Sequence, residues 1–327
     1  MSVFLRRAAL AALVLIVTAC ASPTISGSPS VSGVPSNPPS GTLSASPNGV
    51  SAIEHTTGAT DVILRYEEGG GMMMIPWSAA GAPIFTLYGD GTIIFRNLSK
   101  GSPEPIGSVI PFKPYRTARM NEEQIQSLLE FALGVGGLGQ ARANYQNDMI
   151  SDVTTALFTV NAGGMAKTVS VYALGIESPQ VPDAGARQAF IRLRDHLLEI
   201  ESPQVPDAGA RQAFIRLRDH LLEIDQGGSI KTDLYTPARY RGILLDGQPG
   251  AIDQRSWPWT EIKTAEFVGD GNPDAFQIPV RVMIDAEVAV LALAPYQGGF
   301  IGMPLAGPGD GKFYSFSLRP LLPDDKN

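Results

Sequence analysis

The sequence predicts an α+β fold built mainly from antiparallel sheets. Short β-rich segments are separated by turns that contain Gly and Asp, which is the pattern of hairpins. Helical patterns lie between these hairpins instead of alternating with every strand, as they would in a parallel α/β fold. The chain of 327 residues contains 35 Gly and 26 Pro, which argues against a helical bundle, and its 44% hydrophobic content can form a sizeable core.

The first expected elements are three strands. Residues 61–66 alternate polar and apolar side chains and are predicted to form a strand. Residues 83–88 and 92–96 flank the tripeptide GDG, and a Gly/Asp turn between two β-rich runs predicts a hairpin.

Residues 121–134 are predicted to form the first helix. Asn121 is a typical N-cap residue, and Gln124 stands at the position that completes a capping box. Apolar residues then recur with helical spacing on one face. They are Ile125, Leu128, Leu129 and Ala132.

Five more strands and another short helix are expected further along the chain. The strands cover 152–160 and 166–173, as a hairpin about 161–164, then 239–245, 278–284 and 312–319. The short helix is predicted over 285–294, because Asp285 can cap it, Glu287 lies in its first turn and alanines follow.

The segment ESPQVPDAGARQAFIRLRDHLLEI occurs twice without a mismatch, at 177–200 and 201–224. Solenoid repeats diverge and usually number three or more, so this pair indicates either a recent tandem duplication or an artefact of sequence assembly. Each copy is expected to contain one helix. In the first copy it begins near Pro182 and Asp183 and has an apolar stripe that Arg187 lies outside.

A chain with a single copy would need one docking site for this helix, so the two copies compete for it. The remaining copy is expected to pack beside the first as a helical hairpin, to lie on the surface, or to dock into a second molecule. The last arrangement would give a domain-swapped dimer.

Residues 1–19 have the layout of a secretory signal peptide, in which Arg6 and Arg7 precede a short apolar run. The tetrapeptide VTAC that ends at Cys20, the only cysteine, resembles the lipobox of bacterial lipoproteins. This resemblance implies cleavage before Cys20 and a diacylglycerol anchor on its sulfur, completed by palmitate. The alternative is an ordinary signal peptide with an incidental cysteine.

Residues 20–53 follow as the lipidated cysteine and a predicted tether. Residues 21–50 contain nine Ser, six Pro, four Gly and no charged residue, a composition that cannot bury enough apolar surface to fold. Residues 54–327 then form the α+β body, with a subdomain break expected near residues 225–250.

The remaining motifs favour structural roles. Residues 134–139 match GxGxxG, but they follow a helix, whereas the nucleotide-binding motif must open one. Residues 270–274 faintly resemble a calcium loop and lack its twelfth-position carboxylate. With three histidines, one cysteine and a net charge of −7, the sequence predicts no metal or cofactor and no nucleic-acid partner.

Two clusters of side chains could bind ligands. Trp257 and Trp259 flank Pro258; if exposed they could stack on sugar rings or a peptide, and if buried they would anchor a loop to the core. The run Met72-Met73-Met74 could offer thioether ligands to copper or cover the core as part of a strand or loop. We retain Trp257 and Trp259 as binding candidates and predict no catalytic residue.

Several stretches resemble a loosely defined group of uncharacterised bacterial secreted proteins and lipoproteins. They are PIFTLYGDGTIIFR at 83–96, NEEQIQSLL at 121–129, DVTTALFTVNAGG at 152–164, the pair Trp257-Pro258, and RPLLPDD at 319–325. The resemblance implies export and an α+β body, and it carries no known catalytic residues. The group has a single helix where this chain has two copies.

Together these features predict a lipid-anchored protein of the cell membrane, attached through Cys20 and facing the extracytoplasmic space. With no recognisable catalytic motif in the sequence, we expect a non-enzymatic binding or accessory module for an envelope protein or glycan. The alternative is an envelope hydrolase that uses paired carboxylates, since such a pair leaves no sequence motif.

Overall fold

The computed structural model describes residues 52–96, 103–176, 181–198, 231–251, 253–269, 277–292 and 297–326. The predicted signal peptide, Cys20, most of the tether, the second copy of the duplicated segment and the calcium-like loop lie outside these residues. Residues 50–327 form one compact unit.

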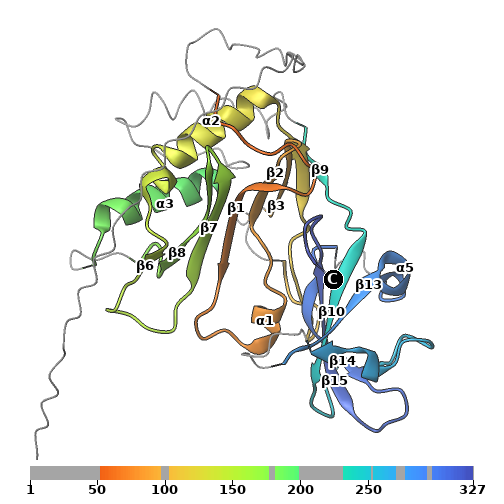
Figure 1. The fold of residues 1–327 in the computed structure, drawn as a ribbon. Coiled ribbons are helices and arrows are strands. Elements are labelled where there is room, and N and C mark those ends of the chain that lie inside the picture. Colours follow the sequence, from red (N-terminus) through yellow and green to blue (C-terminus); the bar gives the residue numbers. More distant parts are fainter. Residues whose placement is uncertain are drawn as a thin grey trace, which may run out of the picture. The chain divides into compact units, whose positions relative to one another are not determined.

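The α+β prediction is confirmed, since two largely antiparallel sheets pack with a few helices (Figure 1). The first sheet has eight strands in the order β6-β8-β7-β1-β2-β3-β5-β9, of which only β6 and β8 pair in parallel. Its strands are β1 (Val62–Gly69), β2 (Phe85–Tyr88), β3 (Thr92–Phe95), β5 (Arg116–Arg119), β6 (Asn144–Tyr145), β7 (Thr155–Ala162), β8 (Met165–Tyr172) and β9 (Asp233–Leu234).

The second sheet has seven strands, in the order β11-β14-β15-β10-β13-β12 with β4 paired to β14. Its strands are β4 (Ile110–Pro111), β10 (Arg239–Asp246), β11 (Arg255–Ser256), β12 (Val268–Gly269), β13 (Pro279–Ile284), β14 (Phe300–Ala306) and β15 (Phe313–Pro320). The described helices are α1 (Ile75–Ala79), α2 (Glu122–Leu133), α3 (Ala184–Leu198), α5 (Asp285–Ala289) and the short 3₁₀ turns η1 (Leu138–Gln140) and η3 (Thr264–Glu266).

Both predicted N-terminal hairpins are present. β2 and β3 pair across the GDG turn, where Gly91 has a φ of 87°, a left-handed conformation that glycine adopts without strain. β7 and β8 approach their turn more closely than predicted. Because Asn161 and Ala162 still pair with β8, the turn contains only Gly163 and Gly164.

The predicted start of α2 is confirmed. The Asn121 side chain accepts a hydrogen bond from the Gln124 backbone N–H at 2.9 Å, and the Gln124 side chain accepts one from the Asn121 N–H at 2.8 Å. This capping box satisfies two N–H groups that the first turn would otherwise leave without partners. The helix ends before Gly134, as the sequence indicates.

Other elements differ from the prediction for local reasons. The helix expected over 285–294 stops at Ala289, and Ala292 has a φ of 53°, which an α-helix cannot contain. Strands β4, β6, β9, β11 and β12 have two residues each, too few to show alternation. β14 escapes prediction because Gly302 and Pro304 interrupt its apolar run.

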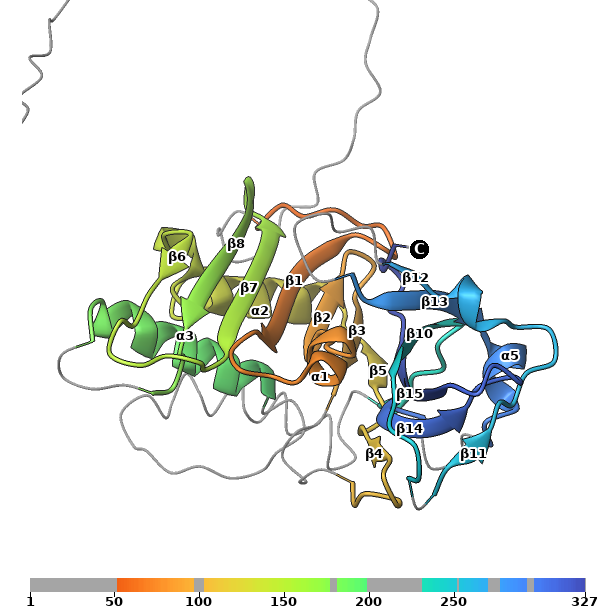
Figure 2. The ribbon, with the colours of Figure 1, turned by 90° about the horizontal axis from the view of Figure 1, so that it is seen from below.

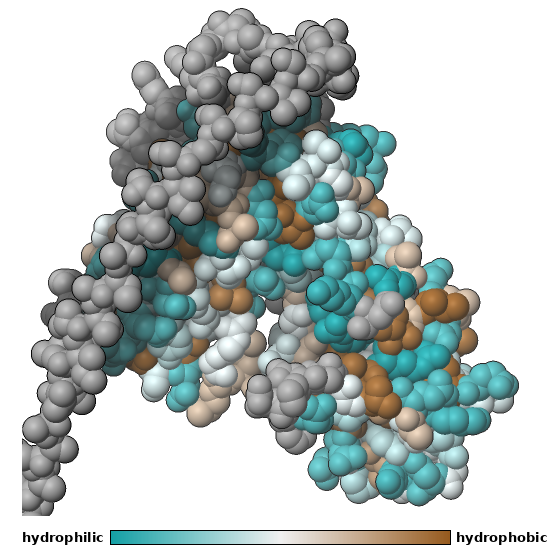
Figure 3. Space-filling model, in the orientation of Figure 1, coloured by the Kyte–Doolittle hydropathy of each residue, from teal (hydrophilic) through white to brown (hydrophobic). Residues whose placement is uncertain are grey.

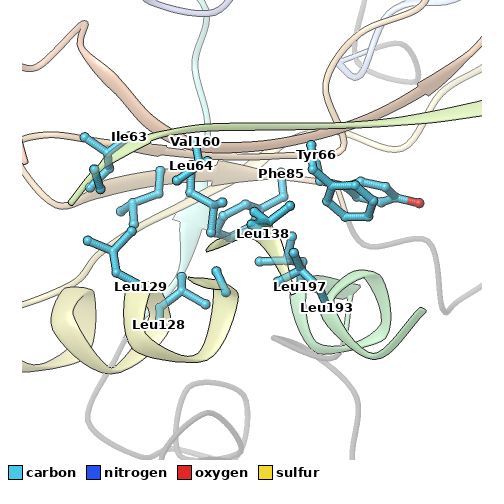
Figure 4. Close-up of a cluster of buried hydrophobic side chains, with 14 of the residues drawn as sticks. Ile63, Leu64, Tyr66, Phe85, Leu128, Leu129, Leu138, Val160, Leu193 and Leu197 are labelled. Carbon is cyan, nitrogen blue, oxygen red and sulfur yellow. The ribbon is translucent and has the colours of Figure 1, made fainter. Parts of the chain in front are cut away.

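Helices α2 and α3 cover one face of the first sheet (Figures 1 and 2). Figure 4 shows Leu128 and Leu129 of α2 and Leu193 and Leu197 of α3 directed toward the sheet side chains around Tyr66. All five are at most 2% exposed. Burying one large apolar side chain contributes ~1.5–3 kcal/mol, so this face accounts for much of the stability of α2 and α3.

The second sheet packs side chains on both of its faces. On one face Phe316 and Trp259 form a core with Val288 of α5. On the other face Ala80, just after α1, packs against Ile243 of β10 and Ile301 of β14. The two sheets therefore have separate cores within one compact unit.

Helix α3 comes from the first copy of the duplicated segment, and its predicted start after Pro182 and Asp183 is confirmed. The placement of Arg187 outside the buried face is wrong, because this side chain is fully buried. Its Nη2 donates hydrogen bonds to the carbonyl oxygens of Tyr172 and Ala173 at 3.0 and 2.7 Å. These carbonyls belong to the last residue of β8 and the residue after it, and the Ala173 carbonyl also accepts the Ile176 N–H at 3.2 Å. Arg187 therefore connects α3 to the end of the strand.

The body begins slightly earlier than predicted. The backbone N–H of Ile53 donates to the Gln126 side-chain oxygen at 2.7 Å, and the Gln126 amide donates to the Ile53 carbonyl at 2.9 Å. The predicted tether therefore ends before Ile53.

The C-terminal residues 321–325 join the two sheets. The Asp324 carboxylate accepts hydrogen bonds from Arg65 Nη2 of β1 at 2.6 Å and from the Tyr88 hydroxyl of β2 at 2.7 Å. The next carboxylate, Asp325, lies 3.0 and 3.1 Å from Arg319 Nη2 of β15. Neighbouring carboxylates thus hold different sheets. The chain itself enters the second sheet at β4, returns to the first at β5, and passes to the second again between β9 and β10, within the range 225–250 in which a subdomain break is expected.

The Asp324 contact predicts a loss of stability on substitution. Asp324→Asn leaves Arg65, whose side chain is only 16% exposed, without its opposite charge. We expect the free energy of unfolding to fall by about 2 kcal/mol, less than for a fully buried pair. Urea unfolding monitored by circular dichroism measures this change.

Asp233→Asn is the matched control for this substitution. Its carboxylate is 67% exposed and lies 3.7 Å from Lys231, so its removal should cost less than about 0.5 kcal/mol. Equal effects of the two substitutions would contradict the proposed importance of the joint.

A second prediction concerns acid stability. His196 of α3 is 3% exposed, its ring packs on Phe131, and its Nε2 has no hydrogen-bond partner among the described residues. Burial lowers the pKa of His196 to about 4. An unfolded histidine has a pKa near 6.5, so the unfolded chain binds a proton that the folded chain excludes between these values.

Stability should therefore be complete above about pH 6.5 and fall by roughly 3 kcal/mol as the pH drops to about 4. His196→Leu should remove this component from the pH dependence of urea unfolding. His55→Gln, a substitution at the edge of the first sheet, should keep it. An unchanged pH profile in H196L would refute the assignment.

Candidate functional site

The two tryptophans predicted as binding candidates lie in the core of the second sheet. Trp259 is 8% exposed, and its indole Nε1 donates to the Glu287 carbonyl at 2.6 Å. Trp257 is half-buried, and its Nε1 donates to the Ile262 carbonyl at 2.8 Å. The two rings meet edge to face with centroids 5.1 Å apart. Because both indole N–H groups are used inside the protein, these contacts favour the anchoring interpretation.

A cavity of about 260 Å³ lies between the β9–β10 connection and α5. It is lined by Leu234, Tyr235, Thr236, Pro237, Tyr240, Asp285, Ala289 and Gln297. Ligand sites usually measure ~300–1,000 Å³, so this cavity suits a small molecule or one unit of a longer one. We call it the Tyr235–Asp285 pocket.

The sheet pairing and the C-terminal segment build this pocket. Tyr235 follows β9, and its hydroxyl donates to the Leu321 carbonyl at 2.9 Å while its ring meets the edge of Tyr115. Tyr240 lies on β10, which pairs with β13, and Asp285 follows β13 as the first residue of α5. The aromatic and acidic lining residues therefore meet because β10 and β13 are neighbours.

The charges of the pocket restrict what it can hold. Asp285 is the only charged residue among the eight lining residues, and it is exposed. Burial raises the pKa of Tyr240, and the charge of Asp285 raises it further, so the Tyr240 hydroxyl stays protonated. The pocket offers hydroxyl and amide groups, two aromatic rings and one negative charge, which suits a neutral or cationic ligand.

The alternative prediction, a hydrolase, requires two carboxylates close together. The arrangement most similar to such a pair lies where residues 321–325 join the two sheets. Glu67 of β1 is half-buried close to Arg65 and Arg319, and burial raises the pKa of its carboxyl. Its acidic neighbours Asp324 and Asp325 are hydrogen-bonded to those two arginines. Asp324 and Asp325 therefore attach the C-terminal segment to β1 and β15.

A second acidic pair is bound in the same way. Arg281 of β13 holds Glu287 at 2.7 Å and Glu266 at 3.2 Å. Glycoside hydrolysis needs two carboxyl groups facing the substrate across ~5–9.5 Å. The Tyr235–Asp285 pocket supplies one, so its lining favours binding.

The methionine run does not cover the core. Met72 and Met74 are 81% and 67% exposed in the loop before α1. Within the described residues no cluster of three or more His, Cys, Asp or Glu is placed to hold a metal ion. On the face shown in Figure 3, hydrophobic residues form several separate areas among hydrophilic ones.

Sequence reasoning did not single out the pocket residues as a site. Tyr235, Tyr240 and Gln297 belong to no motif, and the sequence around Asp285 predicts only a helix cap. The proximity of these residues depends on strand pairing across about 40 intervening residues, which no short pattern encodes.

Comparison of the chain with protein families, with curated proteins and with solved structures gives no match. The resemblance to bacterial secreted proteins and lipoproteins therefore stays a prediction based on the residues quoted above. The chemistry of the pocket is the basis on which its role is proposed.

Proposed function

We propose that this chain is a lipid-anchored module of the cell envelope that binds a small polar ligand in the Tyr235–Asp285 pocket. The lining of the pocket carries the proposal. Tyr235 and Tyr240, of which Tyr240 is only 5% exposed, supply aromatic atoms to the lining, while the exposed residues Asp285 and Gln297 supply hydrogen-bonding groups. A pyranose ring presents the matching combination of an apolar face and peripheral hydroxyl groups, so a neutral glycan unit is the ligand class that we favour.

The proposed location rests on the N-terminal sequence. Cleavage before Cys20 would leave a lipid on the mature N-terminus, and a flexible tether of about 30 residues would span roughly 30 Å. The body could then reach wall components from the extracytoplasmic side of the membrane. Among the described residues no helix has the length and apolar character needed to cross a bilayer.

Ligand binding is testable with N-acetylglucosamine and glucose as probes. Saturation-transfer NMR should show contact of at least one of them with the folded protein. Asp285→Asn and Gln297→Ala should each weaken binding about tenfold, because a lost hydrogen bond to a charged or polar group in a site costs ~1.5 kcal/mol. Both residues are exposed, so the variants should fold normally.

Asp246→Asn is the control for the binding test. Asp246 is an exposed acid on β10, the strand that carries Tyr240, and it does not line the pocket. Binding of neither sugar to the wild-type protein, or equal binding by D285N and D246N, would reject the proposed ligand site. Cleavage of an oligosaccharide built from these units would favour the hydrolase instead.

The anchor is tested separately. Mass spectrometry of the mature protein should show a diacylglycerol-modified Cys20 as its first residue. Cys20→Ala should release the protein from the membrane fraction, because no lipid can be attached without the Cys20 thiol. An unmodified mature N-terminus, or membrane retention of C20A equal to that of the wild type, would refute the anchor.

A further inference from the structure

The face of the first sheet beside α2 is a built docking site for a helix. Phe190 of α3 packs between Tyr145 and Phe158, with ring centroids 4.9 and 5.9 Å away. Leu193 and Leu197 insert beneath Tyr66 in the same core (Figure 4). We call this surface the α3 face.

The polar contacts of α3 are equally specific. Arg187 donates to the two carbonyls at the end of β8, and the His196 ring packs on Phe131 of α2 at 4.2 Å. Asp183 forms an ion pair with Arg142. A helix that fills this face must therefore match it at apolar, cationic, acidic and imidazole positions.

The second copy of the segment matches at every one of these positions. All docked residues that the structure describes, 181–198, recur without a change at 205–222. Phe214, Leu217 and Leu221 would occupy the places of Phe190, Leu193 and Leu197. A docked second copy would thus make the same contacts with the α3 face, and the two occupants differ only in how the chain connects them to β8 and β9.

The connections permit either copy to dock. With the second copy docked, the ten residues 223–232 must reach from the end of the helix to β9, and they can span ~33 Å. The C-terminal half of α3 lies beneath Tyr66 of β1, and β9 is four strand positions from β1, or about 19 Å. On the other side, residues 173–207 would form a long connection from β8.

The loop lengths make the two arrangements nearly equal in free energy. Docking of the first copy closes connections of 11 residues (173–183) and 34 residues (199–232), whereas docking of the second closes 35 residues (173–207) and ten residues (223–232). Because the probability of closing a loop falls with about the 3/2 power of its length, the two arrangements differ by a factor of only about 1.1.

We propose that the α3 face is shared by two interchangeable helices of the same chain, residues 184–198 and residues 208–222. The described arrangement is one of two states, and exchange between them moves the undocked copy from the β9 side of the docked helix to the β8 side. The fold thereby contains a two-state element. A partner that binds the undocked copy in only one of its two positions favours the state with that position, and so determines which copy is docked.

Substitution of one copy at a time tests the exchange. Leu193 is fully buried, so an aspartate there prevents its helix from docking. Removing one of two nearly equally populated states lowers the folding equilibrium constant by only about twofold, for Leu193→Asp and for Leu217→Asp alike. The double variant L193D/L217D has no intact helix for the face and should lose at least about a hundredfold.

The same substitution in a shortened chain is the matched control. Deletion of residues 201–224 leaves one copy, and this chain should fold with nearly wild-type stability. L193D in that background should be as unstable as the double variant. Urea unfolding and size-exclusion chromatography of the folded fraction at two protein concentrations provide the measurements.

Three results would overturn the proposal. If L193D in the full chain is as unstable as the double variant, the second copy does not dock. A stable L193D/L217D variant would show that the α3 face need not be filled. Folding of L193D only as a dimer would show that the second copy docks between chains, as in the domain-swapped arrangement.

Discussion

The carboxylate of Asp324 is the contact on which the arrangement of the two sheets depends. It is held by Arg65 and Tyr88 of the first sheet, whereas Asp325, the next residue, is held by Arg319 of the second. A turn in which the Leu322 N–H donates to the Asp325 carboxylate at 2.7 Å directs the two acids to different sheets. Moving a charge out of water is costly unless its partner is in place, and here the partners lie on separate sheets. The joint adds to other contacts between the sheets, which include the pairing of β4 with β14 and the hydrogen bond from Arg96 to the Gly298 carbonyl.

The same segment places the candidate ligand site. Leu321 accepts hydrogen bonds from the Tyr235 hydroxyl and donates its own N–H to the Arg239 carbonyl, so the β9–β10 connection is fixed on both sides. This connection forms one wall of the pocket, and α5 forms another. Most other charged groups near the joint are used to hold strands together. The pocket, by contrast, is lined by Asp285 and Gln297, two exposed polar residues. We favour binding as the function because these two side chains can contact a ligand, whereas the charged groups at the joint already contact one another.

The duplicated segment shows how sequence identity can create structural degeneracy. A helix is normally specified by contacts that no other part of the chain can reproduce, which gives one native arrangement a clear energy gap. Here two identical segments carry the same apolar residues and the same arginine and histidine, which in the first copy are buried. The choice between them is left to chain connectivity, and connectivity changes free energy only with the logarithm of loop length. A fold with one α3 face and two equivalent helices is therefore poorly able to distinguish its occupants.

The sequence by itself determined the local elements and the fold class. The reciprocal bonds of Asn121 and Gln124, the GDG turn between β2 and β3, and the start of α3 follow from residues close together in the chain, and each is present. It did not reveal the burial of Arg187, the short edge strands or the assembly of Tyr240 with Asp285. Those depend on which strands pair and on which carbonyls the packed helix can reach, and contacts between distant residues decide both. Tertiary structure also decided that Trp257 and Trp259 anchor a core, because only the packed fold shows where their N–H groups donate.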